Sequence, residues 1–399
     1  MIIFLQKFNL NSFMTPEPVI SFAQIKEFLA LPVYLYKNDP NWIHPLDKDI
    51  EDVFDKNKNK FFRHGEICRW ILRNEHGKAT GRVAAFINNK TANTFDQPTG
   101  GMGFFECIND KNAAFILFDL CKNWLTERGM KAMDGPINFG ERDRWWGLLT
   151  EGYAPPTYRM NYNPAYYKEF FEAYGFKPYF EQYIYEMKVA QKLPEKYAEK
   201  AQRIANDPGY TFSHLKLKEL NKAIDDFRII YNKAWVRHDN FKAMSETQAR
   251  SIIYSFKPII EEDLLWFSYY KGDPVGFFLM LPEINQIFRY FSGKLNTWNK
   301  LRFLWHRWRK TCNKIFGAAF GIVPEHQHKG LEGAIIMAAA NVLQHTNRYD
   351  KIEITWIGDF NPKMLHLLDS LGATRIKTMI TYRKLFDEAA VFKRAPVIG

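Results

Sequence analysis

The chain has 399 residues, of which 46% are hydrophobic, 25% charged and 16% aromatic. This composition is ordinary for a soluble globular protein, and the length is enough for two or three domains with cores of their own. Lysine and arginine outnumber the acids by 55 to 44, a net charge of +11, which favours anionic partners such as a nucleotide cofactor, a nucleic acid or an anionic membrane surface.

The four cysteines form no Cys-x-x-Cys pair, which argues against a disulfide framework or a zinc site. No apolar run reaches the 18 or so residues of a membrane span. We therefore expect no metal, no membrane span and a cytoplasmic location. The first residues lack a cationic region before their short apolar run, and Met14 is a second possible start.

Hydrophobic periodicity predicts an α/β order of elements over the first 190 residues. Ser21 is the expected N-cap of the first helix, and His76-Gly77 is expected to turn a hairpin. The expected helices are 21–31, 112–128 (closed by Gly129) and 163–175; the expected strands are 66–72, 81–87, 104–108, 131–136 and 179–189, with a charged, indole-rich loop at 137–149.

The same order restarts in the second half after a mainly helical, polar stretch at 191–262. The expected strands are 264–270, 275–281, 316–323, 352–357 and 376–385, and the expected helices are 331–345 and 361–371. Residues that mark turns and helix ends recur at nearly one offset. Gly77 and Gly81 have counterparts 195 residues later, Asn163-Pro164 has one 198 residues later, and Gly175 has one 197 residues later. A duplicated domain is the first interpretation, and two unrelated α/β domains are the alternative.

The pattern of residues in the stretch 316–345 predicts an anion-binding site. Pro324 ends a strand, a polar turn follows, and a glycine precedes a helix whose free N–H groups and positive end would face a ligand. Gln327-His328-Lys329-Gly330 resembles the Gln/Arg-x-x-Gly-x-Gly/Ala pyrophosphate loop of the GNAT superfamily of acetyl-CoA-dependent N-acyltransferases. The match is partial, because Glu332 stands at the last small position and the glycine, Gly333, comes one later. An ordinary strand–turn–helix is the alternative.

The resemblance extends over nearly the whole chain. It points to a bacterial group of tandem-domain GNAT-like proteins, through the segments NDPNWIHPL, GRVAAFIN, GFFEC, GPIN, YNPAYY, GIVPEHQHKGLEGAI and ITWIGDFNP. It implies two tandem GNAT-like domains, 1–190 and 191–399, each a mostly antiparallel mixed sheet flanked by helices. In the first, Asp110 stands where a diphosphate would bind, so that domain is expected to lack the pyrophosphate loop.

The resemblance places acetyl-CoA or another acyl-CoA on the second domain. The residues it implies for cofactor binding are Gly321, Ile322, Val323, Gln327, His328, Lys329, Gly330, Leu331, Gly333 and Asn361. For Asn361, a helix N-cap is at least as good an interpretation.

Acyl transfer to an amine requires a base for the amine proton and donors for the thioester oxyanion, which the Val323 N–H could supply. Many relatives use a tyrosine four residues before the helix-ending glycine as the acid, but here those positions are Leu368 and Phe171. Glu353, Asp359 and Tyr382 are the catalytic candidates, and Tyr382 or His366 could substitute for the missing tyrosine acid. Solvated or paired carboxylates are the alternative for the two acids.

The loop at 138–146 is the candidate acceptor site, because sites gather on loops at strand ends. We expect it to face the 353–361 edge of the second domain, with an interdomain clasp as the alternative. The candidate substrate-binding residues are Glu141, Arg142, Asp143, Arg144, Trp145, Trp146 and Tyr162.

The most basic stretch, 294–310, interleaves Trp298, Phe303, Trp305 and Trp308 with lysines and arginines. We favour an amphipathic helix that packs its indoles on the domain. The alternatives are a lid, a membrane-surface helix or a nucleic-acid contact.

The sequence thus predicts an acyl-CoA-dependent N-acetyltransferase acting on a small-molecule amine or peptide. The alternatives are a non-catalytic acyl-CoA- or ligand-binding pseudoenzyme, and a nucleic-acid-binding protein supported by charge alone. The sequence does not determine the oligomeric state.

Overall fold

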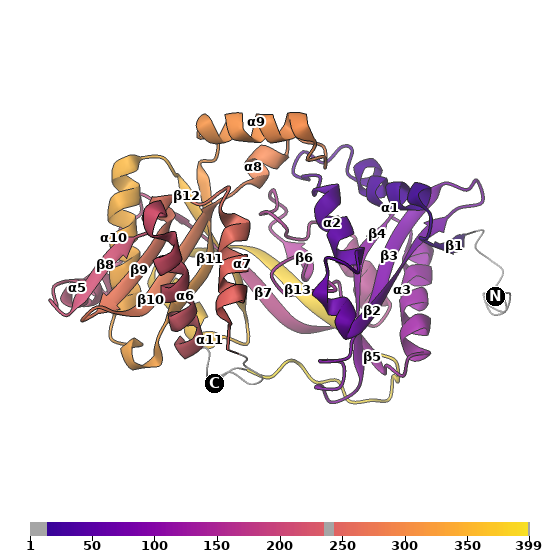
Figure 1. Cartoon of the computed structure of the whole chain (residues 1–399). Coiled ribbons are helices and arrows are strands. Elements are labelled where there is room, and N and C mark those ends of the chain that lie inside the picture. The colour runs from indigo at the N-terminus through magenta and orange to yellow at the C-terminus, as the bar shows by residue number, and fades with distance from the viewer. Residues whose placement is uncertain (1–13, 235–242, 398–399) are drawn as a thin grey trace.

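The computed structural model describes residues 14–234 and 243–397. Its strands form one continuous sheet with helices on both faces, as Figure 1 shows. The sheet order is β1-β2-β3-β4-β5-β13-β7-β12-β11-β10-β9-β8, with β6 also paired to β13. This mixed α/β architecture confirms the predicted fold class.

In the first half, helices α1 and α3 cover opposite faces of the hairpin β2–β3. Ile71 packs with Phe28 of α1, whereas its neighbour Leu72 packs with Leu117 of α3. This follows from the alternation of side chains along a strand. The elements are β1 (Thr15–Pro18), α1 (Phe22–Leu35), α2 (Asp47–Phe54), β2 (Gly65–Arg73), β3 (Ala79–Asn88), β4 (Thr99–Cys107), α3 (Lys111–Thr126), β5 (Ala132–Gly135), β6 (Leu148–Glu151), α4 (Tyr167–Ala173) and β7 (Lys177–Lys188).

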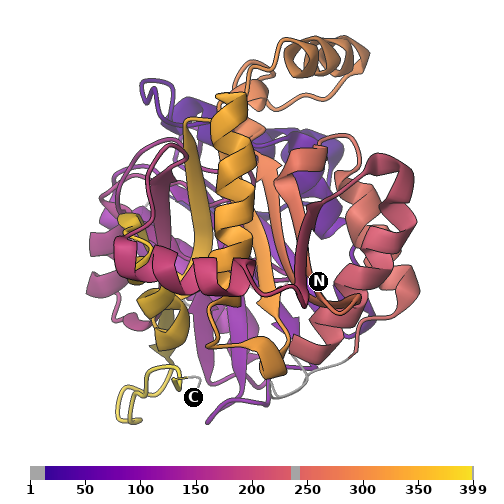
Figure 2. The ribbon, with the colours of Figure 1, turned by 90° about the vertical axis from the view of Figure 1, so that its left-hand side faces the viewer.

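The second half repeats this order, with α10 on one face of its strands and α6 and α7 on the other (Figure 2). The elements are α5 (Glu195–Ala205), β8 (Tyr210–His214), α6 (Leu220–Ala234), α7 (Glu246–Phe256), β9 (Leu265–Tyr270), β10 (Asp273–Pro282), α8 (Asn285–Phe288), α9 (Thr297–Trp308), β11 (Lys314–Ile322), α10 (Leu331–Thr346), β12 (Lys351–Gly358), α11 (Pro362–Ser370) and β13 (Thr374–Leu385).

The last strand of each half lies against strands of the other half. β13 pairs antiparallel with β5, with Tyr382 opposite Gly135, while β7 pairs antiparallel with β12, with Tyr185 opposite Ile354. β13 and β7 also pair with each other along most of their length. The two halves therefore share the centre of the sheet; the domain boundary at 190/191 stays a prediction.

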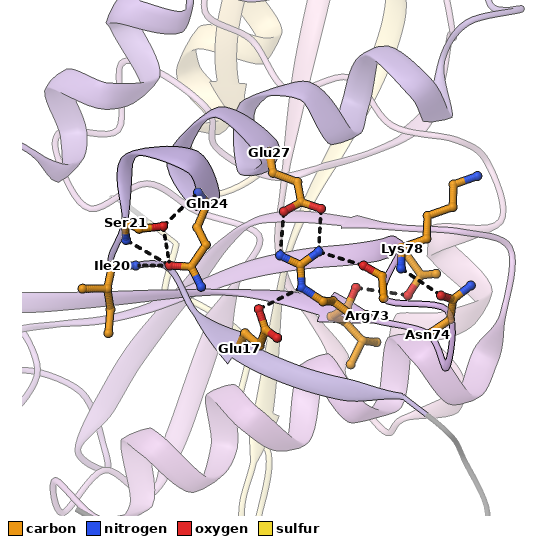
Figure 3. A network of polar contacts seen from close by, with 11 residues as sticks. Glu17, Ile20, Ser21, Gln24, Glu27, Arg73, Asn74 and Lys78 are labelled. Atoms are coloured by element: carbon orange, nitrogen blue, oxygen red, sulfur yellow. Dashed lines mark hydrogen bonds and ion pairs between the residues drawn. The ribbon is translucent and has the colours of Figure 1, made fainter.

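Arg73 ties the N-terminal elements together (Figure 3). Its guanidinium donates to both carboxylate oxygens of Glu27 on α1, each at 2.6 Å, and to Glu17 on β1 at 2.8 Å. Ser21 caps α1 with a capping box to Gln24, as the sequence predicts for the N-cap.

Three strands, β1, β6 and β8, and one cap differ from the sequence-based expectation. β6 begins at the end of the segment expected to be a loop and extends beyond it, and β8 lies within the stretch expected to be mainly helical. Asn163 does not cap α4, because its amide bonds both the N–H and the C=O of Leu149 and so holds β6 in place. Asn361 does cap α11, accepting from Met364 N–H at 3.2 Å.

Candidate functional site

Each half contains a pair of parallel strands that separate partway along their length. β11 and β12 are paired from Lys314–Lys351 to Gly317–Ile354, and β4 and β5 from Thr99–Ala132 to Gly101–Asp134. Beyond these points β11 pairs only with β10, and β4 only with β3. We call the space where each pair of strands separates a gap. The strand pairings between β4 and β11 show that β4 and β5 run in the direction opposite to β11 and β12. The two gaps therefore open toward opposite ends of the sheet.

The C-terminal gap is open along β11. Ala318 is exposed in the middle of this central strand, where β11 carries an extra residue opposite Leu279–Met280. Such a bulge bends the strand and leaves backbone groups outside the ladder. An extended ligand could therefore lie along this part of β11.

The predicted pyrophosphate loop follows β11 as a tight turn. Gly330 has a φ of +103° and precedes α10, whose N-terminus has no side-chain cap. The Glu332 carboxylate accepts the His328 N–H at 3.2 Å, and Gln327 donates to Ile322 O at 2.8 Å. A carboxylate thus already occupies one of the donors that a diphosphate would use.

Helix α5 packs directly on this loop. A Cβ on Gly330 would lie 3.0 Å from the Lys200 carbonyl oxygen, and one on Gly333 would lie 2.7 Å from the Tyr197 ring. Because α5 approaches so closely, both positions require glycine.

The remaining sequence-based candidates of the second half have structural partners. Glu353 is 1% exposed, bonds Lys314 Nζ at 2.6 Å and accepts from Thr157 Oγ1; nearby Lys377 and Lys314 keep the pKa of its carboxyl below the usual value. Asp359 pairs with Arg394. The Val323 N–H donates to Val275 O at 2.9 Å, which leaves it unavailable to an oxyanion in this conformation.

Tyr382 lies in the first half rather than beside the C-terminal gap. It is fully buried on β13, opposite Gly135, and its hydroxyl donates to Glu172 at 3.0 Å. The strand exchange explains this position, which the sequence-based interpretation did not foresee. The geometry does not bring Tyr382 together with Glu353 at one site.

The candidate acceptor residues are spread over two environments. Glu141 pairs with Lys60, and Asp143 pairs with Arg144, all near the surface. Arg142 stacks against the rings of Trp146, Phe180 and Phe360, at 5.0–5.7 Å from the ring centres, so this loop does contact the 353–361 edge. Trp145 and Tyr162 instead line a cavity in the first half.

That cavity lies beside β4 in the first half, where β4 and β5 have separated. Gly103 permits the chain after β5 to cross β4, since a Cβ there would lie 1.9 Å from Ile137 O. The walls include several aromatic rings, together with buried charged groups. The lining includes Trp42, His44, Leu46, Asp49, Arg82, Phe104, Phe105, Glu106, Trp145, Leu148, Tyr158, Arg159, Tyr162, Tyr167 and Asn285.

Glu106, at the C-terminal end of β4, is the centre of the buried polar network. Tyr36 and Tyr167 donate to its Oε2 at 2.7 and 2.9 Å, and Arg82 Nη2 lies 3.6 Å from Oε1. Burial raises the pKa of the Glu106 carboxyl, against the opposing effect of Arg82. Burial also raises the pKa of both phenols well above the usual value, so they remain protonated.

Two further features make this cavity fit a ligand. Arg82 Nε is buried and lacks a hydrogen-bond partner among the described residues, which leaves a donor for a bound group. Opposite it, Asp49 is held by Arg159 Nη2 at 2.8 Å and by the Tyr158 hydroxyl. The cavity lining thus combines apolar side chains with two acids, three phenols and two arginines.

The helix that follows β4 has no free anion site at its N-terminus. Asp110 caps α3, and its carboxylate accepts from the N–H groups of Asn112 and Ala113 at 2.8 and 3.1 Å. That the first half lacks a pyrophosphate loop stays a prediction.

Sequence reasoning missed the Glu106 network. The signal was present, because Arg82 and Glu106 are charged residues inside strands that are otherwise apolar, and such charges are rarely buried without a partner. Within 14–234 and 243–397, no group of three or more possible ligand side chains is placed to hold a metal ion. Across the same residues, no helix is long and apolar enough to span a membrane.

The fold is a tandem GNAT-like fold. It superposes on a tandem GNAT protein from the clavulanic acid biosynthesis pathway with a TM-score of 0.53 and 10% identity, covering 94% of this chain and 100% of that one. No family model matches the chain.

Two relatives share the chain along almost its whole length. It is 28% identical to the bacterial ceramide synthase of Caulobacter vibrioides, over 94% of this chain and 98% of the relative. It is 23% identical to protein YghO of Escherichia coli K12, over 90% and 92% of the two chains.

Proposed function

We propose that this protein is an N-acyltransferase that moves an acyl group from acetyl-CoA or another acyl-CoA to the amine of a small molecule or peptide. The observation that carries the proposal is the buried Glu106 carboxyl in an aromatic cavity of a tandem GNAT-like fold. The similarity to a bacterial ceramide synthase supports the reaction class, because a ceramide is an amide of a long-chain amino alcohol.

Glu106 is the proposed base. An amine arrives largely as an ammonium ion and must lose a proton before it attacks a thioester. The raised pKa of Glu106 makes its carboxylate a stronger base than an exposed glutamate. The two phenols that donate to Oε2 fix the carboxylate and leave Oε1 toward Arg82.

The same network can serve the rest of the transfer. As the new C–N bond forms, negative charge develops on the thioester oxygen, and Arg82 Nε is an unused donor that could stabilise it. The C–S bond then breaks, and Tyr36 or Tyr167 can give a proton to the thiolate and recover one from protonated Glu106.

The C-terminal loop is proposed as a separate site for the diphosphate of an acyl-CoA, not as the donor site of the reaction at Glu106, because the two gaps open toward opposite ends of the sheet. Its uncapped helix end and Lys329 favour an anion, but the two candidate acids of the second half, Glu353 and Asp359, are already paired. By itself this half therefore fits ligand binding without catalysis. The C-terminal gap opens at the end of the sheet opposite Glu106, so the two sites can be tested separately.

The first test is Glu106→Gln, a nearly isosteric change. Turnover of an acyl-CoA against an amine panel should fall at least about 100-fold, the usual contribution of a general base. The wild-type rate should rise with pH as Glu106 loses its proton, and the variant should lose that rise. Glu66→Gln, at an exposed ion pair with Arg128, is the matched control. Unchanged turnover in a folded Glu106→Gln protein would exclude this centre.

The second test concerns acyl-CoA binding at the loop. Calorimetry with acetyl-CoA should show weaker binding for Lys329→Glu and roughly 3- to 10-fold tighter binding for Glu332→Ala, since removal of one like charge is typically worth about 1 kcal/mol. Glu325→Ala, exposed on the same turn, is the control and should change little. If neither loop variant alters binding, acyl-CoA binds elsewhere.

A further inference from the structure

Helix α9 stands away from the body of the protein, at the top of Figure 1. Its outward side chains are large and apolar: Trp298 is 68% exposed, Leu304 63% and Trp308 78%, with Leu301 and Trp305 beside them. This corrects the sequence-based expectation that the indoles pack on the domain. At helical spacing these five side chains form one continuous apolar face.

The opposite side of α9 fixes its orientation. Asn299 is buried and donates to Lys294 O at 2.8 Å, Phe303 packs 5.8 Å from the Phe288 ring, and His306 stacks on Tyr290 at 5.2 Å. These contacts attach the helix without using the outward face. The outward indoles and leucines are therefore left largely exposed.

Positive charge flanks the apolar face. The segment 294–310 contains no acidic residue, and Lys294, Lys300, Arg309 and Lys310 are exposed. Arg307 differs, because it pairs with Glu261 on the body. An apolar stripe of tryptophan and leucine bordered by lysine and arginine is the pattern of a helix that lies in a membrane interface.

We propose that α9 docks this protein on an anionic lipid bilayer, with its outward face in the interfacial region. The cationic border would repel a second copy of the same surface, which argues against a homodimer contact. Single-stranded nucleic acid would use the rings as stacking platforms but would leave Leu301 and Leu304 without a partner. A bilayer satisfies both the apolar stripe and the charges.

The docking helix lies next to the Glu106 cavity. The loop before α9 accepts a hydrogen bond from Asp47 N–H at Gly293 O, 2.8 Å, and Gly293 packs on the His44 ring. His44 and Asn285, at the start of α8, line the cavity. Docking would thus bring the cavity wall close to the lipid surface; membrane binding itself does not depend on the proposed reaction.

The test is sedimentation of the full-length protein with vesicles of phosphatidylglycerol and phosphatidylcholine, compared with phosphatidylcholine alone. We expect binding to the anionic vesicles that weakens as salt is raised. Trp298→Ser/Trp305→Ser/Trp308→Ser and Lys300→Glu/Arg309→Glu/Lys310→Glu should each reduce it at least tenfold. Lys216→Glu/Lys218→Glu/Lys257→Glu changes the same charge at exposed lysines elsewhere and should reduce it far less.

A second measurement locates the contact. Vesicles containing brominated lipid should quench tryptophan fluorescence of the wild type, and the triple tryptophan variant should lose that quenching. Circular dichroism and turnover of the variants check that the fold is kept. No binding to anionic vesicles, equal loss in the lysine control, self-association that the tryptophan variant abolishes, or tighter binding to single-stranded RNA than to vesicles would each overturn the proposal.

Discussion

Glu283 is a buried carboxyl whose protonation should affect stability near neutral pH. It is 4% exposed, accepts the N–H groups of Tyr158 and Asn285 at 2.9 and 3.1 Å, and burial raises its pKa to about 7. Its neighbours include Glu353 and Lys314, which act in opposite directions on that pKa. Both of its hydrogen-bond donors, Tyr158 and Asn285, line the cavity.

The sign of the pH effect follows from this pKa. Between about 4.5 and 7 the folded protein holds a proton on Glu283 that the unfolded chain has released, so this group lowers the stability of the fold progressively over that range and by a constant amount above it. Glu283→Gln keeps the acceptor but cannot ionise. We expect it to be as stable as wild type at pH 5 and more stable at pH 8, by at most about 3 kcal/mol.

Urea unfolding at the two pH values measures this difference. Glu66→Gln, whose carboxylate is exposed, should show no such dependence. A variant that is less stable than wild type at pH 8 would mean that the ionised Glu283 is stabilised by its neighbours, and the assigned direction would then be wrong.

At the scale of elements, local patterns predicted most of the fold. Ser21 correctly predicted the start of α1, and Gly129 correctly predicted the turn that follows α3. Both predictions succeeded because helix caps and left-handed turns depend on a few adjacent residues. β6 and β8 were missed because they are short strands whose pairing partners, β13 and β9, are distant in sequence. The exposed face of α9 was also missed, since periodicity shows that a helix has an apolar side but not whether anything covers it.

The candidate site was harder to predict for the same reason. The Glu106 network joins Tyr36, Arg82 and Tyr167, which are brought together only by the folded sheet and α1. Spacing along the chain carries no signal for such a cluster. The loop at 327–330 was visible because its residues are consecutive, yet α5, which covers it, comes from a segment more than 120 residues earlier.

Arg73 should be an element-scale determinant of stability. It joins β2 to β1 and α1 through one bidentate and one single ion pair, and its side chain is 17% exposed. Arg73→Met keeps the stem but leaves Glu17 and Glu27 unpaired, so the free energy of unfolding should fall by about 1–2 kcal/mol. Arg250→Met, at an exposed helix pair with Glu246, should cost no more than about 0.5 kcal/mol. Equal effects in denaturant titrations would show that the Arg73 cluster adds no more than a surface pair.

For the whole molecule, the exchange of β7 and β13 makes each half depend on the other. Arg383 on β13 donates to both oxygens of Asp134 on β5, at 2.6 and 2.8 Å, and both residues are buried. Cutting the chain after residue 190 removes β13 from between β5 and β7 and leaves both with an open edge. It also separates the buried ion pair, and an unpaired buried charge is strongly destabilising.

We therefore expect fragments 1–190 and 191–399 to fail to fold cooperatively when made alone, and to recover a cooperative transition when they are coexpressed. Size-exclusion chromatography and thermal unfolding of each fragment and of the pair provide the measurement. The physical reason is that neither fragment contains the neighbours of its last strand, so each would expose sheet edges that the intact chain covers. Two fragments that each unfold cooperatively, with no gain on mixing, would show that the halves are independent domains and that the shared centre of the sheet contributes little to stability.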